Sequence, residues 1–127
     1  MTKPQPTVRR DGRSDAFFDA AARGELAIRR CADCAAWHAP ETTGCHVCGG
    51  ASLEWTAASG DAVLITWAKV HPRGDGPAQH IAFVELAEGP WLHAALDGVD
   101  SPAAGLALKA AFVGPEDGEP LLVFRTA

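Results

Sequence analysis

The fold is decided by one stretch, CADCAAWHAPETTGCHVCGG, which occupies residues 31–50. This stretch contains two Cys-x-x-Cys pairs, made by Cys31, Cys34, Cys45 and Cys48. Two such pairs can place four thiolates at the corners of a tetrahedron around one ion, because each two-residue gap turns the backbone around the metal. The spacing therefore predicts a closed, structural tetrathiolate metal site.

Zinc is the metal that we expect, because a closed four-sulfur shell has no open position for chemistry and serves to fold a segment too small for its own core. Iron remains the alternative, since the same ligands suit an electron-transfer centre and spacing does not separate the two metals. A reducing cytoplasm disfavours disulfides, and no βαβ pattern supports a thioredoxin-like redox pair. His46, which lies inside the second pair, is left out because four thiolates complete the shell.

The segments that flank the cysteines predict a small ribbon. Residues 25–30 alternate polar with apolar side chains and lead directly into the first pair, and residues 53–55 are their natural antiparallel mate. Gly49 follows the second pair and lets the backbone bend without steric penalty, whereas Ala35 is a less suitable residue at the matching place after the first pair.

Upstream of the ribbon the sequence predicts one short amphipathic helix. Ser14 can cap it, Phe17 and Phe18 begin its apolar positions, and Gly24 is a suitable terminator. Residues 1–13 mix proline, glycine and charges without apolar periodicity, which predicts a disordered leader.

Downstream of the ribbon the chain changes to strand-like runs separated by glycine- and proline-containing breaks. Five short strands in a segment of this length are typical of a small barrel such as the OB-fold, with a partial sandwich as the alternative. We therefore expect a mainly β protein in which residues 14–57 form one short N-terminal helix and a zinc ribbon, and residues 58–127 form a five-stranded OB-fold. The five runs are 62–71, 80–86, 91–96, 106–113 and 121–125.

Charge and composition exclude several functions. The 127 residues are 47% hydrophobic and carry a net charge of −5, and the acidic excess lies in the second half of the chain. No basic stripe is available to displace counterions from phosphates, so we expect neither nucleic-acid binding nor docking on anionic membranes. No run is long enough to span a membrane and the N-terminus is unlike a secretory signal, so the sequence predicts a cytoplasmic protein.

Searching the sequence for catalytic patterns yields none. There is no recognisable nucleophile with its base, no open metal site and no phosphate-binding glycine motif. The histidines His71, His80 and His93 lie in or beside predicted strands without evident partners, and Glu85 with Glu88 is most simply a solvated edge. The sequence therefore predicts a protein that is not itself an enzyme.

Taken together, the pieces of the chain form a familiar arrangement. The residues that carry it are Phe17-Phe18, Gly24-Glu25-Leu26, the four cysteines, Pro40, Gly49, Leu53-Glu54-Trp55, Ser59-Gly60, Thr66-Trp67, Val70-His71, Val84-Glu85-Leu86, Glu88-Gly89 and Phe124-Arg125. This arrangement resembles the family called domain of unknown function 35, in which a rubredoxin-like zinc ribbon precedes an OB-fold. The resemblance covers about residues 14–127 and is specific in combination.

The resemblance implies a non-catalytic accessory subunit in acyl-CoA metabolism. Such proteins accompany thiolase-like, hydratase or aldolase enzymes, including those of steroid side-chain or other lipid degradation, and can help to hold the CoA thioester. Only the four metal ligands carry over residue by residue. As weaker candidates we take Lys69 and Arg73 for the CoA phosphates, and Trp37, Phe17 and Phe18 for the partner interface, because aromatic residues dominate buried interface centres.

Two functions of other classes stay open as alternatives. A zinc ribbon with an OB-fold can bind single-stranded nucleic acid through aromatic and cationic side chains, although the charge points away from this function. A rubredoxin-like electron carrier would hold iron in the same four cysteines. The sequence leaves open the acyl substrate, the partner, the stoichiometry and whether the chain belongs to a longer fusion.

Overall fold

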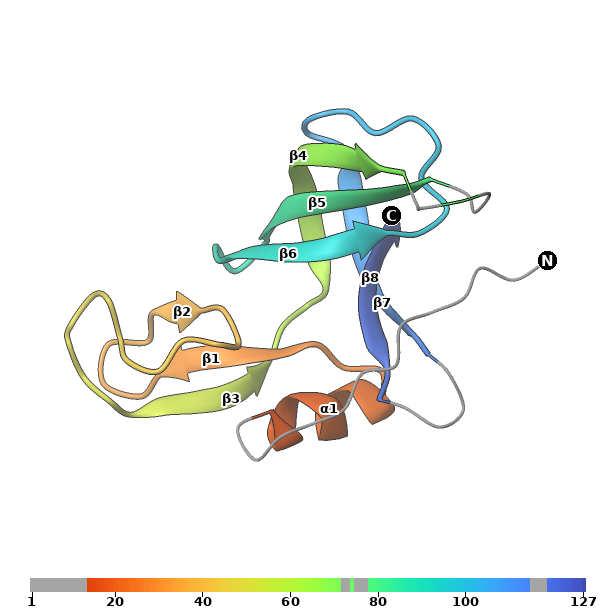
Figure 1. The fold of residues 1–127 in the computed structure, drawn as a ribbon. Helices are drawn as coiled ribbons and strands as arrows, with labels where there is room; N and C mark the ends of the chain where they lie inside the picture. The colour runs from red at the N-terminus through yellow and green to blue at the C-terminus, as the bar shows by residue number, and fades with distance from the viewer. Residues whose placement is uncertain (1–13, 72–73, 75–77, 115–118) are drawn as a thin grey trace.

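The computed structural model describes residues 14–71, 74, 78–114 and 119–127. The predicted leader, residues 1–13, therefore lies outside the described residues, and so does Arg73. The described part of the chain forms one short helix and eight strands (Figure 1). Their bounds are α1 (Asp15–Ala22), β1 (Ala27–Cys31), β2 (Trp37–His38), β3 (Leu53–Ala57), β4 (Asp61–Val70), β5 (Gln79–Leu86), β6 (Trp91–Leu96), β7 (Ala107–Val113) and β8 (Leu121–Thr126).

The predicted helix is present and ends where glycine allows it to end. Ser14 occupies the N-cap position, but its side chain makes no capping hydrogen bond. At the other end Gly24 has a φ of +79°, and the backbone N–H of Glu25 reaches back to the carbonyl of Ala20. This is the Schellman ending that a glycine favours. No helix within the described ranges is long and apolar enough to cross a membrane.

The predicted ribbon is a three-stranded antiparallel sheet in the order β2-β1-β3. The central strand β1 pairs with β3 in a register that places Ile28 opposite Thr56. On its other edge β1 pairs with β2, with Arg29 opposite His38. The strand β2 is only two residues long and was not among the predicted elements.

The second half of the chain is the predicted five-stranded barrel. It is closed in the order β4-β5-β6-β8-β7, with β6 and β8 parallel and the other neighbours antiparallel. A register shift between Leu64 and Thr66 in β4 bends that long strand, as β-bulges do. A closed five-stranded barrel with this strand order confirms the predicted OB-fold.

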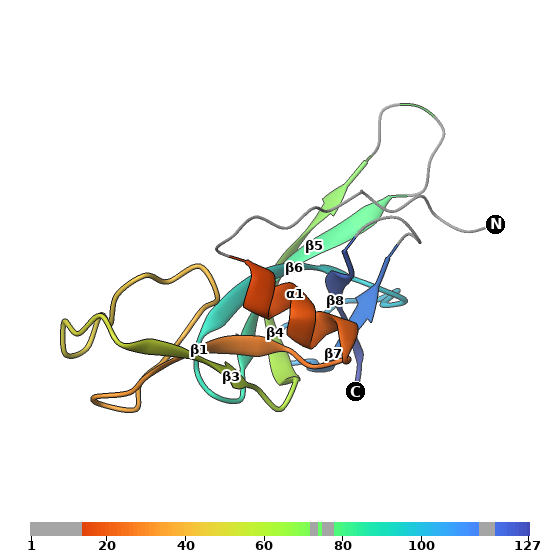
Figure 2. The same ribbon diagram turned by 90° about the horizontal axis from the view of Figure 1, so that it is seen from below.

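The ribbon and the barrel share one hydrophobic core. Leu26 and Ile28, at the start of the ribbon, belong to the same buried cluster as Leu64, Val84 and Phe124 of the barrel. Closed five-stranded barrels have little interior of their own, so apolar side chains from outside can complete the burial. Helix α1 also lies between the two halves, beside both β1 and β7 (Figure 2).

Helix α1 joins the two halves through one aromatic side chain. The ring of Phe17 lies 6.5 Å from Trp55 of the ribbon and 6.3 Å from Phe112 of the barrel, both centroid to centroid. Its neighbour Phe18 is buried and meets it edge to face at 5.2 Å. Such aromatic clusters stabilise beyond the area they bury.

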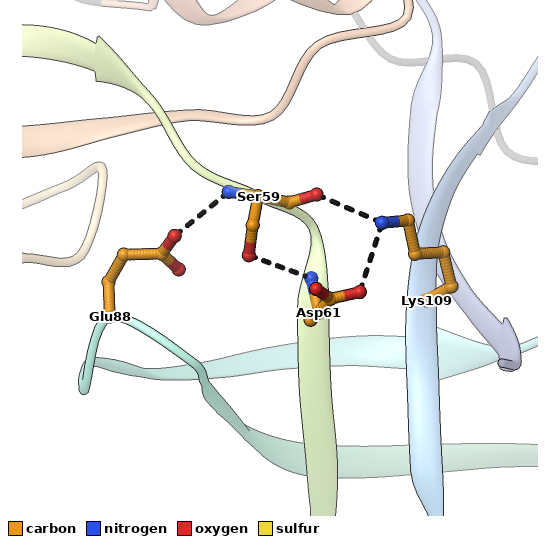
Figure 3. Close-up of polar contacts among 4 residues, drawn as sticks. All are labelled: Ser59, Asp61, Glu88 and Lys109. Atoms are coloured by element: carbon orange, nitrogen blue, oxygen red, sulfur yellow. Dashed lines mark hydrogen bonds and ion pairs between the residues drawn. The ribbon is translucent and has the colours of Figure 1, made fainter.

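Polar contacts hold the short segment between ribbon and barrel (Figure 3). The backbone N–H of Ser59 donates to Glu88 Oε2 at 2.8 Å, and its carbonyl accepts from Lys109 Nζ at 3.1 Å. Lys109 also pairs with Asp61 at 3.0 Å. The turn between β5 and β6 and the strand β7 therefore both anchor the segment, and Glu88 is not the solvated edge that the sequence suggested.

Candidate metal centre

The four cysteines lie on two turns that have the same backbone geometry. In the first, the N–H of Ala35 donates to the carbonyl of Cys31 at 2.8 Å; in the second, the N–H of Gly49 donates to Cys45 at 3.0 Å. Ala35 and Gly49 both have positive φ, at 66° and 78°. The sequence had marked these two positions for this reason, and the structure confirms it.

The four sulfur atoms fit a tetrahedral metal ion. All four lie within 4.8 Å of one another, and the Cys31–Cys48 and Cys34–Cys45 sulfur pairs are 3.6 and 3.5 Å apart. A zinc–sulfur bond of about 2.3 Å in a tetrahedron separates the sulfurs by about 3.8 Å, which is close to these spacings. Soft thiolates are also the donors that zinc and iron prefer.

Electrostatics give an independent reason to place a cation among these thiols. The backbone N–H of Cys48, assisted by the N–H of Val47 and by His38, lowers the pKa of Cys45 to about 5. The N–H of Ala36 also favours a Cys34 thiolate, but the hydrogen bond to Cys45 and burial outweigh it, and the pKa of Cys34 rises to about 12. Four thiolates at this distance repel one another, so full deprotonation requires a bound metal ion.

The contact of His38 with a metal ligand was not predicted from the sequence. His38 is 7% exposed, and its Nε2 lies 3.3 Å from the Sγ of Cys45. The contact depends on the pairing of β2 with β1, which the sequence gave no reason to expect. His46 is exposed, meets the His38 ring edge to face at 5.5 Å and, as predicted, is not part of the ligand cluster.

The three predicted interface aromatics are already packed within the chain. Phe18 is 8% exposed, and Phe17 lies against the ribbon and the barrel as described above. Trp37 is half-buried and packs against the core, with the Arg30 guanidinium 5.1 Å from its ring centroid. Of the three, Trp37 and Phe17 therefore keep some accessible surface, and their role at an interface stays a prediction.

Among the described residues, most of the large exposed apolar side chains lie instead on the barrel, while Val47 lies on the ribbon. Val63, Phe83 and Trp91 are 37%, 45% and 55% exposed and come from β4, β5 and β6. Alternation along the strands turns them outward, since Ala82, Val84 and Leu92 between them are buried. We call these three residues the aromatic face.

Neighbouring polar groups order the aromatic face. Trp91 Nε1 donates to Glu85 Oε2 at 3.0 Å, and the Phe83 ring lies 5.1 Å from that of His93. The rings are thereby held in place before any partner binds, which lowers the entropy lost on association. Glu85, like Glu88, has a specific partner.

Basic side chains are scarce and mostly engaged in the described part of the chain. Carboxylates pair with Arg23, Lys109 and Arg125. Tryptophan rings lie beneath the guanidinium groups of Arg29 and Arg30. Lys69, the predicted CoA contact, is exposed on β4, and among the described basic residues it is the one that remains unengaged. Its predicted companion Arg73 lies outside the described residues.

A groove of about 350 Å³ lies between α1 and the start of the β7–β8 connection. None of the described residues that line it is charged. These residues therefore offer no cation to a phosphate group. The lining residues are Ala21, Ala22, Gly24, Ala111, Phe112, Val113, Gly114 and Pro120.

The fold and the cysteine cluster together define a class, the metal-braced ribbon joined to an OB-fold barrel. Two family models match the chain in series: the ChsH2 rubredoxin-like zinc ribbon domain over residues 18–54 and the ChsH2 C-terminal OB-fold domain over residues 55–113. The chain belongs to the ChsH2 family. The description of one solved structure sets ChsH2 beside the domain of unknown function 35, the family that the sequence resembles.

Two solved structures illustrate the likeness. A chain described as an Ltp2-ChsH2(DUF35) aldolase is 28% identical with a TM-score of 0.78, covering 96% of this chain and 98% of that one. A protein of unknown function from Sulfolobus solfataricus, described as a member of the domain of unknown function 35 family, has a TM-score of 0.65 at 15% identity, over 91% of this chain and 86% of that one. This likeness shows the fold alone. No curated protein matches the chain.

Proposed function

We propose that this chain is a non-catalytic accessory subunit of an aldolase, and that it binds a partner of thiolase-like fold which acts on acyl-CoA. The observation that carries the proposal is the likeness, over nearly the whole of both chains, to the ChsH2 chain described in an Ltp2-ChsH2 aldolase. A reducing cytoplasm is the location we propose, because it keeps the four thiols available to a metal.

The metal centre supports a structural role for the ribbon. Four thiolates fill a tetrahedral shell, so no position remains where a substrate or an activated water molecule would bind. No other cluster of metal-ligating side chains occurs among the described residues. The carbon–carbon bond chemistry would therefore take place on the partner.

The aromatic face is the surface that we propose for the partner. It combines a large ordered tryptophan with a phenylalanine and a valine on one side of a rigid barrel, and buried aromatic anchors dominate the energetics of protein interfaces. Trp37, at the edge of the ribbon, is the second candidate anchor. We assign the CoA thioester of a steroid side chain or another lipid to the partner's site, with Lys69 as the described cation able to reach a CoA phosphate.

Reconstitution with an Ltp2-type aldolase tests the proposal. The two purified chains should elute together in size-exclusion chromatography, and the aldolase should cleave its acyl-CoA substrate faster in the complex. Trp91→Ala should weaken binding by about 2 kcal/mol, roughly 30-fold, without unfolding the barrel. Val47→Ala is the matched control, because Val47 is 73% exposed but lies on the ribbon. Separate elution of the unaltered chains would refute the proposal.

Single-stranded nucleic acid is a second candidate ligand, favoured by one observation. Phe83 and Trp91 lie on β5 and β6, the second and third strands of the barrel, where OB-folds bind oligonucleotides. Against it stand the net charge of −5 and the engagement of the described basic side chains. Fluorescence anisotropy with a labelled oligonucleotide at low salt separates the two ligands, and we expect no binding.

A further inference from the structure

His38 is held at the metal centre by the sheet and not by the metal. It lies on β2, whose pairing with β1 places it opposite Arg29, two residues before the first metal ligand. Of the polar or charged residues that the structure describes, His38 is the one that is buried, with 7% of its surface exposed. Its ring lies against the sulfur of Cys45.

A buried imidazole requires hydrogen-bond partners, because an unpaired polar group removed from water costs roughly 1–3 kcal/mol. The Sγ of Cys45 lies 3.3 Å from its Nε2. A metal-bound thiolate carries no proton and can only accept, so Nε2 must be the donor. The chemistry of the pair therefore selects the Nε2–H tautomer of His38.

We propose that His38 is a positioning residue of the metal centre, and that its Nε2–H hydrogen bond to the Cys45 thiolate stabilises the bound metal ion. Cys45 also accepts the backbone N–H groups of Val47 at 3.4 Å and of Cys48 at 3.5 Å. These two backbone hydrogen bonds belong to the turn that contains Cys45. The third hydrogen bond, from His38, comes from a side chain on strand β2. The inference does not depend on the proposed aldolase partner.

The third hydrogen bond compensates for excess negative charge. Four thiolates around one divalent ion leave a net charge of −2 at a site where two of the sulfurs are buried. Each N–H that points at a sulfur disperses part of this charge, and outer donors of this kind typically change metal affinity by about 10–100-fold. Cys45 is buried, so water replaces the lost donor poorly.

Two variants separate hydrogen bonding from packing. His38→Leu keeps a buried side chain but removes the donor, whereas His38→Gln retains an N–H near the position of Nε2. We expect His38→Leu to bind zinc about 10-fold or more weakly in competition with a chelator, and His38→Gln to stay close to the unaltered protein. His46→Leu is the matched control, because it removes the ring beside His38 and leaves the contact with Cys45 intact.

Cobalt substitution gives a readout that packing alone would not move. Loss of a hydrogen bond raises the energy of the sulfur lone pairs, so the thiolate-to-cobalt charge-transfer band of His38→Leu should move to longer wavelength, while that of His38→Gln should not. In the unaltered zinc protein, the nitrogen chemical shifts of the imidazole should report the Nε2–H tautomer.

Each contrary result overturns the inference. Equal zinc affinity in His38→Leu and the unaltered protein would do so, as would equal weakening in both variants, which would assign His38 to packing. A cobalt spectrum of three sulfurs and one nitrogen would make His38 a ligand instead. Should His38→Leu fail to fold, the imidazole tautomer still decides, since an Nδ1–H tautomer excludes the proposed bond.

Discussion

The backbone N–H of Ser59 donates its hydrogen bond to the carboxylate of Glu88, which follows it by 29 residues in the turn between β5 and β6. This single contact ties the exit of the ribbon to the far end of a barrel hairpin. The other oxygen, Oε1, is buried and has no partner among the described atoms. The carboxylate therefore depends on the Ser59 N–H for part of the stabilisation that water would otherwise provide.

Glu88→Ala should lower the free energy of unfolding by about 1–2 kcal/mol, because the change leaves the Ser59 N–H without its charged acceptor. Lys109→Met removes the exposed ion pair with Asp61 and the exposed hydrogen bond to the Ser59 carbonyl, and should cost no more than about 1 kcal/mol because water can replace both. Urea denaturation of the metal-loaded protein measures both. A larger loss in Lys109→Met than in Glu88→Ala would contradict this ranking.

Ala35→Gly should stabilise the first metal-binding turn. A φ of 66° is unfavourable for an alanine and free for a glycine. After the greater chain entropy of glycine is subtracted, we expect a gain of about 0.5–1 kcal/mol. The reciprocal change, Gly49→Ala at a φ of 78°, should destabilise by a similar amount. Chemical denaturation with zinc bound compares the two variants. A lower free energy of unfolding in Ala35→Gly would show that the backbone at Ala35 is not strained.

Phe17→Ala should loosen the helix from both halves of the molecule. The side chain is partly buried and contacts Trp55 and Phe112, so its removal should lower the free energy of unfolding by about 2 kcal/mol. Phe83→Ala is the control, because that ring is 45% exposed and surface substitutions usually cost less than about 0.5 kcal/mol. Thermal unfolding followed by circular dichroism distinguishes them, and equal losses would contradict the assignment.

Removal of the metal should unfold the ribbon, because the segment between β1 and β3 has little core of its own. Cys31→Ser and Cys48→Ser should do the same. Because Leu26 and Ile28 of the ribbon complete the core of the barrel that carries the aromatic face, both variants should also abolish binding to the aldolase partner. Elemental analysis of the purified protein should find one zinc ion per chain and no visible colour. A red protein that contains iron would favour the electron carrier instead, and a metal-free variant that still binds its partner would refute the bracing role.

The local parts of the fold could be predicted because their causes are local. The cysteine spacing, the alternation in the barrel strands and the glycine that ends α1 each act within a few residues of chain. The same holds for Ala35, whose place in the turn identified it as a poor occupant before its φ was known. These features need no knowledge of which strands meet.

The missed features all depend on long-range pairing. His38 reaches Cys45 only because the two-residue strand β2 pairs with β1, and a strand that short has no periodicity. The aromatic face was missed for the same reason. Only the pairing of β5 with β6 puts Phe83 and Trp91 on one face of the sheet, and only closure of the barrel makes that face the exterior. The contact between Phe17 and Phe112 was not predicted, because nothing in the sequence brings the two rings together.

The burial of Leu26 and Ile28 among barrel residues has a consequence for how the molecule comes apart. Although the family models divide the chain between residues 54 and 55, calorimetry of the metal-loaded protein should record one cooperative transition and not two. A barrel expressed from residue 58 onward would lack both side chains and open its interior to water, so the two halves are modules of sequence but a single unit of folding.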